Sequence, residues 1–140
     1  MRWVKNRIKL IFNIKDPIHK KRQHLSRQIY KDFDGTIKYG PFSGLKISDK
    51  LWWSHTDIGS IFFGFYEQEV LNEILKFSSK KGIHNFIDIG AADGYYGIGV
   101  LKANLFEHSY CFELTQKGQE VIKTNAKLNN VFNKITINGK

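Results

Sequence analysis

The chain has 140 residues and a mass of 16.3 kDa, and its 41% hydrophobic residues suit one domain with its own core. The formal net charge of +9 is uneven, since residues 1–27 carry nine Lys/Arg and one acid whereas the other 113 residues carry 13 bases and 12 acids. This distribution excludes a basic binding face spread over the whole protein. The single cysteine, Cys111, excludes an internal disulfide, so we expect a buried structural thiol and a cytoplasmic protein.

Residues 1–30 are predicted to be a basic amphipathic arm. Its apolar residues are spaced as one helical face, namely Trp3, Val4, Ile8, Ile11 and Phe12. Asp16 and Pro17 are expected to end this helix. Three alternatives stay open for the arm: a helix packed on the domain, peripheral membrane contact through residues 1–27, or nucleic-acid binding. Lys9 and Lys15 interrupt the apolar run, so we expect no transmembrane segment and no signal peptide.

Residues 31–65 are predicted to be a β-rich lead-in to the following domain. Glycines separate four short β-favouring runs, at residues 36–39, 45–47, 51–53 and 61–63. Such runs predict hairpins or a small antiparallel layer. Trp52 and Trp53 are expected to lie in this half-buried sheet rather than in a ligand pocket.

Residues 66–140 are predicted to form a partial Rossmann-like cofactor-binding domain. A helical pattern from Tyr66 to Phe77 is followed by strand patterns at residues 83–89 and 108–114 and at the start of a third strand near residue 135. Between the strands we expect one helix over residues 95–106 and a second that is entered near Thr115. This order predicts an α/β protein with a parallel sheet. Because a doubly wound sheet normally has more than three strands, we expect a truncated domain or one completed by a partner, and the oligomeric state stays open.

Residues 85–99 are the most informative segment, because they read as a strand, a glycine-rich turn and a helix start. Gly90 and Gly94 would let the backbone approach a ligand at the positive end of the helix. Glu113 ends the next strand and is expected in the same crevice, where a carboxylate accepts hydrogen bonds from two ribose hydroxyls. The alternative is that the glycines are only turn residues and that Asp88 only caps backbone amides.

The acids of this turn discriminate between nucleoside cofactors. No register of residues 88–100 supplies the G-x-G-x-x-G fingerprint of dinucleotide-binding proteins. Asp88 and Asp93 would also repel a pyrophosphate, by on the order of 1–4 kcal/mol each at a surface-like dielectric. S-adenosylmethionine has an ammonium and a sulfonium group and no phosphate. The turn therefore favours S-adenosylmethionine, and it disfavours a nucleotide-dependent oxidoreductase.

These residues also carry a family resemblance. Residues 86–96, Phe-Ile-Asp-Ile-Gly-Ala-Ala-Asp-Gly-Tyr-Tyr, resemble motif I of class I S-adenosylmethionine-dependent methyltransferases, especially the FkbM-like group. Further segments are similar to the strands, helix end and upstream loops of that family, at residues 40–45, 64–67, 110–114, 125–130 and 134–138. The resemblance covers residues 39–140.

The resemblance implies roles for residues around the turn. Asp88, Gly90 and Gly94 would shape the pocket for the methionine part of the cofactor. The other cofactor-binding residues that it implies are Ala91 and Asp93 in the turn, Glu113 at the ribose, Leu114 beside the adenine, and Tyr66 and Glu67 over the methionine end. The family usually has Asn where this chain has Ala92, and two outcomes stay open: weaker cofactor binding, or binding left intact because Asp93 is nearby.

The implied activity is methyl transfer to an oxygen of a sugar or other small acceptor, and a fragment without activity is the open alternative. A reaction at oxygen needs a base, and the sequence identifies none, because His55, His84 and His108 are isolated. No residue cluster has metal-ligand spacing, so no metal is expected. The competing hypothesis is a non-catalytic α/β scaffold whose basic arm binds membrane or nucleic acid.

Overall fold

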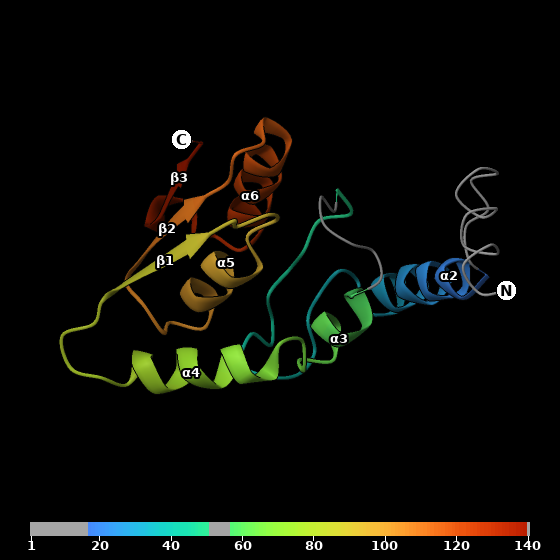
Figure 1. Cartoon of the computed structure of the whole chain (residues 1–140), viewed down its shortest axis with the longest axis horizontal. Coiled ribbons are helices and arrows are strands. Elements are labelled where there is room, and N and C mark those ends of the chain that lie inside the picture. Colours follow the sequence, from blue (N-terminus) through green and yellow to red (C-terminus); the bar gives the residue numbers. More distant parts are fainter. Residues whose placement is uncertain (1–16, 51–56, 140) are drawn as a thin grey trace, which may run out of the picture.

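A computed structural model describes residues 17–50 and 57–139 of the chain. Figure 1 shows a parallel sheet with its helices at one end of the molecule and α2 at the other. The elements are α2 (Pro17–Asp32), α3 (Ile58–Phe62), α4 (Gln68–Ser78), β1 (Asn85–Ile89), α5 (Tyr95–Lys102), β2 (His108–Phe112), α6 (Gln116–Leu128), the 3-10 helix η1 (Phe132–Lys134) and β3 (Ile135–Asn138). The predicted α/β class and helix–strand order of residues 66–139 are confirmed.

The three strands form one parallel sheet in the order β1-β2-β3. In its register, Asp88 pairs with Cys111, which pairs with Ile137. These three residues share one face of the sheet. Helix α5 packs on this face over β1 and β2, and α6 packs beside β3. Cys111 is fully buried there, and its burial raises the thiol pKa to about 12. The predicted structural role of this cysteine is therefore confirmed for a neutral thiol in the core.

Helix α6 begins where the sequence predicts, because Thr115 caps it by accepting a hydrogen bond from the Gly118 N–H at 3.1 Å. Its buried face includes the amide side chains of Asn125 and Asn129. Asn129 accepts the Lys46 N–H at 2.8 Å and donates to the Lys46 carbonyl at 2.7 Å. These amides therefore satisfy backbone groups that a neighbouring strand would satisfy in a sheet.

The predicted hairpin is confirmed for the runs at 36–39 and 45–47: the Ile37 N–H donates to the Leu45 carbonyl at 2.9 Å, the Ile47 N–H donates to the Gly35 carbonyl at 2.8 Å, and Thr36 and Lys46 form an antiparallel bridge. Among the described residues of 31–65, no further strand extends this pair into a layer. Residues 61–63 were predicted as a β run, but Ile61 and Phe62 lie in α3. The run at 51–53, with Trp52 and Trp53, lies outside the described residues. The aliphatic side chains of the described runs and Phe62 are buried in the main core, whereas Tyr39 and Phe63 are exposed. Between the runs, Phe42 stacks edge-on against Tyr95 of α5 with ring centroids 5.2 Å apart. Burial in this core, in addition to the short hairpin pairing, accounts for the apolar character of these runs.

Within the predicted arm, Pro17 begins α2. The helix end predicted at Asp16 and Pro17 depends on residues 1–16. A proline suits the first helical position, because it has no N–H to leave unpaired there and its φ is already helical. Helix α2 packs on α3, with the Tyr30 and Phe62 rings 5.8 Å apart. Residues 1–16 lie outside the described residues. Within residues 17–50 and 57–139, no helix combines the length and the apolar character that crossing a bilayer requires.

Candidate functional site

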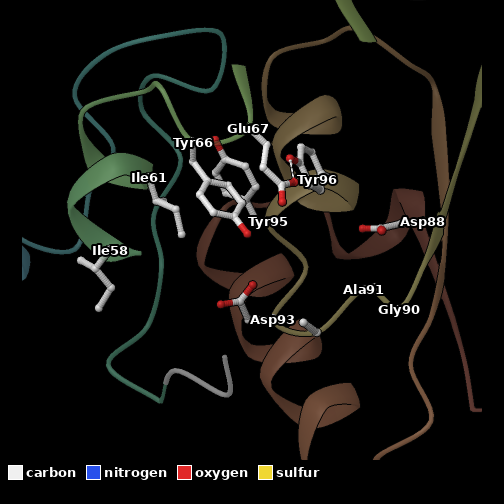
Figure 2. A pocket seen from close by; sticks show the side chains of 11 residues that line it. Ile58, Ile61, Tyr66, Glu67, Asp88, Gly90, Ala91, Asp93, Tyr95 and Tyr96 are labelled. Atoms are coloured by element: carbon white, nitrogen blue, oxygen red, sulfur yellow. Dashed lines mark hydrogen bonds between the residues drawn. The ribbon is translucent and has the colours of Figure 1, made fainter. Parts of the chain in front are cut away.

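A cavity of about 200 Å³ lies at the carboxyl end of β1, between the glycine turn, the starts of α4 and α5, and helix α3. Figure 2 shows the tyrosine rings gathered on one side of it and the carboxylates of Asp88 and Asp93 on the other. Its lining residues are Ile58, Ile61, Tyr66, Glu67, Asp88, Gly90, Ala91, Ala92, Asp93, Tyr95 and Tyr96. The predicted turn and the predicted Tyr66-Glu67 pair therefore face one common space.

The glycine turn is closed by hydrogen bonds within the protein. The N–H groups of Gly90 and Ala91 both donate to the Phe112 carbonyl, at 2.8 and 3.0 Å. The Ala92 N–H donates to the Glu113 carboxylate at 3.0 Å, and the Gly94 N–H donates to the Ala91 carbonyl at 2.7 Å. These four N–H groups are thus already used, although phosphate-binding turns offer such groups to the ligand.

Asp88 leaves β1 toward the start of α5, and its Oδ2 accepts the Gly97 N–H at 3.0 Å. Burial raises the Asp88 pKa to about 6, the Gly97 hydrogen bond opposes this rise, and the nearby Asp93 charge adds to it. Burial also raises the Asp93 pKa, against hydrogen bonds from the N–H groups of Tyr95 and of Asp93 itself. The cavity floor therefore holds two carboxyl groups that are poorly solvated.

Three tyrosines and Glu67 form the opposite wall. The Tyr95 ring lies 4.9 Å from that of Tyr96 and 5.7 Å from that of Tyr66, between centroids and in edge-on arrangements. The Tyr96 hydroxyl donates to Glu67 Oε2 at 2.5 Å. Burial, followed by the charge of Glu67 and a hydrogen bond to it, raises the Tyr66 pKa to about 12. The tyrosines therefore stay neutral at physiological pH and present both ring surface and hydroxyl donors.

The lining of this cavity has one sign of charge. It contains the carboxyl groups of Glu67, Asp88 and Asp93, and none of its described residues is Lys, Arg or His. Aromatic ring faces add further negative potential. A ligand with positive charge would relieve the repulsion between the carboxylates, whereas a phosphate would increase it.

Three predicted residues lie elsewhere. A Cβ on Gly94 would meet the Ile98 side chain at 2.7 Å, so this glycine serves the helix start and its packing rather than the cavity wall. Leu114 is 85% exposed beyond the end of β2. Glu113 does not line the cavity, but it touches the turn through Ala92.

The Glu113 carboxylate accepts hydrogen bonds from its own protein that the sequence did not predict. Its Oε1 accepts the N–H and the hydroxyl of Thr115 at 2.9 and 2.7 Å, and its Oε2 accepts the Ala92 N–H. Burial acts to raise its pKa, but these hydrogen bonds outweigh burial and the pKa is lowered. A carboxylate has about four acceptor positions, so Glu113 has room for one further donor in this arrangement rather than for two ribose hydroxyls.

The backbone conformation at residue 92 is unfavourable for the Ala that this chain has in place of Asn. This residue has a φ of +50°, in the left-handed region that Asn adopts far more readily than Ala. The Asn that the resembling family usually has would therefore relieve strain in the turn. Its absence here is a cost to the backbone as well as a lost polar group.

Sequence reasoning missed Tyr95, Tyr96, Ile58, Ile61 and Ala92 as cavity residues. Tyr95 and Tyr96 follow Gly94 directly, so their position at a helix start facing the turn was a usable signal. Ile61 was assigned to a β run and Ile58 to no element, so neither gave a signal, but their spacing of three places them on one side of α3.

No group of three or more His, Cys, Asp or Glu within residues 17–50 and 57–139 could hold a metal ion. No protein-family model matches the sequence, and a comparison with curated proteins gives no significant match.

Proposed function

We propose that the cavity binds the methionine end of S-adenosylmethionine, and that the chain is the cofactor-binding part of a Rossmann-like class I methyltransferase. The observation that carries this proposal is the combination of three carboxyl groups and three tyrosine rings around one small space. Sulfonium and ammonium groups are attracted both by carboxylates and by aromatic faces, most strongly where water is excluded. The resemblance of residues 86–96 to motif I supports the same cofactor.

The turn argues against a dinucleotide more strongly than the missing fingerprint alone. Four of its N–H groups are engaged within the protein, so a pyrophosphate would lack donors there. It would also approach Asp88 and Asp93. The oxidoreductase hypothesis is therefore disfavoured by hydrogen bonding as well as by charge.

The size of the cavity supports binding of one end of the cofactor rather than of the whole molecule. Pockets that enclose a drug-sized ligand have about 300–1,000 Å³, which exceeds the 200 Å³ found here. The adenosine end would then lie outside the cavity, along the ends of the strands, near Glu113 and the exposed Leu114. Methyl transfer to a sugar or other small hydroxyl compound remains the proposed reaction, on the resemblance alone.

Titration calorimetry of the full chain with S-adenosylmethionine, S-adenosylhomocysteine and NADH tests the proposal. We expect saturable binding of the first two and none of NADH. Asp93→Asn removes a cavity charge and should weaken S-adenosylmethionine binding at least tenfold, because the cation loses a poorly solvated partner. Glu120→Gln is the matched control, since this exposed acid on α6 lies away from the cavity. Absence of saturable binding, or equal losses in both variants, would contradict the proposal.

The competing function, a non-catalytic scaffold with a membrane- or nucleic-acid-binding arm, is favoured by a different observation. Helix α2 carries five Lys/Arg and one acid, and its Ile18 and Leu25 are more than half exposed. This hypothesis makes no use of the cavity. Saturable binding of S-adenosylmethionine that depends on Asp93 would rule out a scaffold without a ligand.

A further inference from the structure

Three aromatic side chains are stacked on the surface beside α3, and we call them the aromatic ladder: Tyr39, Phe63 and Phe65. The rings of Tyr39 and Phe63 are nearly parallel, at 5° with centroids 6.2 Å apart. Phe63 and Phe65 follow at 18° and 6.3 Å. All three are exposed, Tyr39 and Phe65 by more than half. Exposed apolar side chains gathered in this way are typical of interaction sites.

The ladder is held by the backbone beneath it. A Cβ on Gly64 would lie 2.2 Å from the Tyr39 carbonyl oxygen, and one on Gly40 would lie 2.5 Å from the Gly64 carbonyl oxygen. Both glycines have positive φ, so larger residues would be strained as well as blocked. The Lys38 N–H also donates to the Phe62 carbonyl at 3.1 Å. Two loops far apart in sequence are thus locked together, and this contact fixes the rings side by side at the surface.

The ladder continues into the basic part of the molecule. Phe33, directly after α2, meets the Phe63 ring edge-on at 5.3 Å, and the Lys38 ammonium lies 5.9 Å from the Phe33 centroid. On α2 itself, Ile18 and Leu25 are seven residues apart, which places them on one side of the helix two turns apart. The Lys/Arg residues of this helix are Lys20, Lys21, Arg22, Arg27 and Lys31.

Charge separates this region from the rest of the described chain. Residues 17–50 contain eight Lys/Arg and three acids, whereas residues 57–139 contain eight Lys/Arg and nine acids. The basic excess of the described residues therefore belongs to the segment that carries α2, Phe33 and Tyr39. Lys38 and the basic residues of α2 give this segment complementarity to an anionic surface.

We propose that the aromatic ladder and α2 form a docking surface for an anionic phospholipid membrane. Aromatic rings are favoured at the level of lipid headgroups, and a helix with Lys/Arg and exposed aliphatic residues binds in the same zone. A single-stranded nucleic acid fits less well, because base stacking needs open ring faces. The Phe63 ring lies nearly parallel to those of Tyr39 and Phe65 and meets that of Phe33 edge-on, so it is already engaged within the protein. This surface does not depend on what the cavity binds.

Vesicle co-sedimentation of the full chain tests the proposal, with phosphatidylcholine vesicles and with vesicles that also contain phosphatidylserine, an anionic lipid. We expect binding to the anionic vesicles at least tenfold tighter than to the neutral ones. Tyr39→Ser combined with Phe65→Ser should weaken binding to anionic vesicles at least tenfold, and Lys20→Gln, Lys21→Gln and Arg22→Gln together should do the same.

The control is Phe132→Ser, which removes an exposed aromatic ring on η1 and should leave vesicle binding unchanged. Circular dichroism checks that every variant keeps its helices. Because residues 1–16 are identical in all variants, any difference belongs to the surface described above. Equal binding to neutral and anionic vesicles, parent-like binding of the ladder variant, or tighter binding to a single-stranded RNA oligonucleotide than to vesicles would each overturn the proposal.

Discussion

The two faces of the parallel sheet differ sharply in how they are covered. On the face toward α5 and α6, Ser109 and Cys111 are fully buried. On the opposite face, Ile87 and Ile89 are 61% and 84% exposed. Parallel sheets usually bury both faces. Adjacent residues of one strand therefore lie in different environments, one in the protein interior and the next in water. The helix-covered face supplies nearly all the packing of this sheet.

The comparison predicts that sensitivity to substitution alternates along the strands and follows the side to which each residue points. Changes under α5 should be costly, because close-packed cores do not yield to added volume. Changes on the open face should cost little.

The largest effect is expected for Gly97→Ala in α5. A Cβ at this position would lie 2.2 Å from the Cys111 sulfur and 3.0 Å from the Ser109 hydroxyl, so α5 would have to move off the sheet. We expect a loss of more than about 3 kcal/mol in the free energy of unfolding, at the upper end for overpacked cores. Urea denaturation followed by circular dichroism measures it.

Cys111→Ala provides the control for Gly97→Ala, because it removes the sulfur that the new methyl group would meet. The double variant should recover a substantial part of the stability that Gly97→Ala loses. If the double variant lost the sum of the two single losses, the Gly97 position would not be in close contact with the Cys111 sulfur.

The second effect concerns the pH dependence of stability at Asp88, which lies on the covered face. Its pKa is about 6 in the folded protein, above the ordinary value of 3.8 for this carboxyl group, because the group is buried. Between these values the folded state holds the proton more often than the unfolded state, so stability falls as pH rises from about 4 to 7. Two pKa units correspond to about 2–3 kcal/mol.

Asp88→Asn isolates this contribution. An amide oxygen can still accept the Gly97 N–H, and it carries no charge to desolvate. Relative to Asp88→Asn, the parent should therefore lose stability between pH 4.5 and pH 7.5, whereas other titrating groups such as Glu113 cancel in the difference. Parallel pH profiles of the two proteins would mean that the Asp88 carboxylate is well solvated.

A smaller effect is expected in the turn that leads from β1 to the covered side. Ala92 has a φ of +50°, and Ala92→Asn replaces it with a residue that tolerates this conformation. We expect a gain of about 0.5–1 kcal/mol in the free energy of unfolding, since strained residues of this kind cost about that much or more. Thermal unfolding measures it, with Ala103→Asn at a φ of −79° as the control that should gain nothing.

The covered half of the molecule was predictable from sequence for a physical reason. In residues 85–138, the strands and helices are short local segments with apolar patterns of their own, and α5 and α6 begin directly after Gly94 and Thr115. The order of elements then determines a parallel sheet with few alternatives. The turn with Asp88 and Asp93 was consequently placed at one end of the sheet, whereas the Tyr66-Glu67 pair was assigned to the same site only through the family resemblance.

The lead-in was not predictable in the same way, because its structure depends on distant partners. The backbone of Lys46 is satisfied by Asn129, 83 residues away, and Phe42 packs against Gly99 and Tyr95. No local pattern encodes these contacts. The tyrosine wall of the cavity was not predicted for a related reason. It forms only when the starts of α4 and α5 come together, where the Tyr96 hydroxyl donates to Glu67.

The smallest effect is expected on the open face, for Ile89→Thr. This side chain is 84% exposed, and threonine keeps the β-branched shape that strands favour, so the free energy of unfolding should change by less than about 0.5 kcal/mol. Ile137→Thr is the matched change on the covered face of β3, where the side chain packs against the core, and it should cost about 1–2 kcal/mol. If Ile89→Thr cost as much as Ile137→Thr, and only at high protein concentration, the open face would be buried against another copy of the chain in solution. The difference between the two isoleucines therefore measures directly how far the sheet is one-sided.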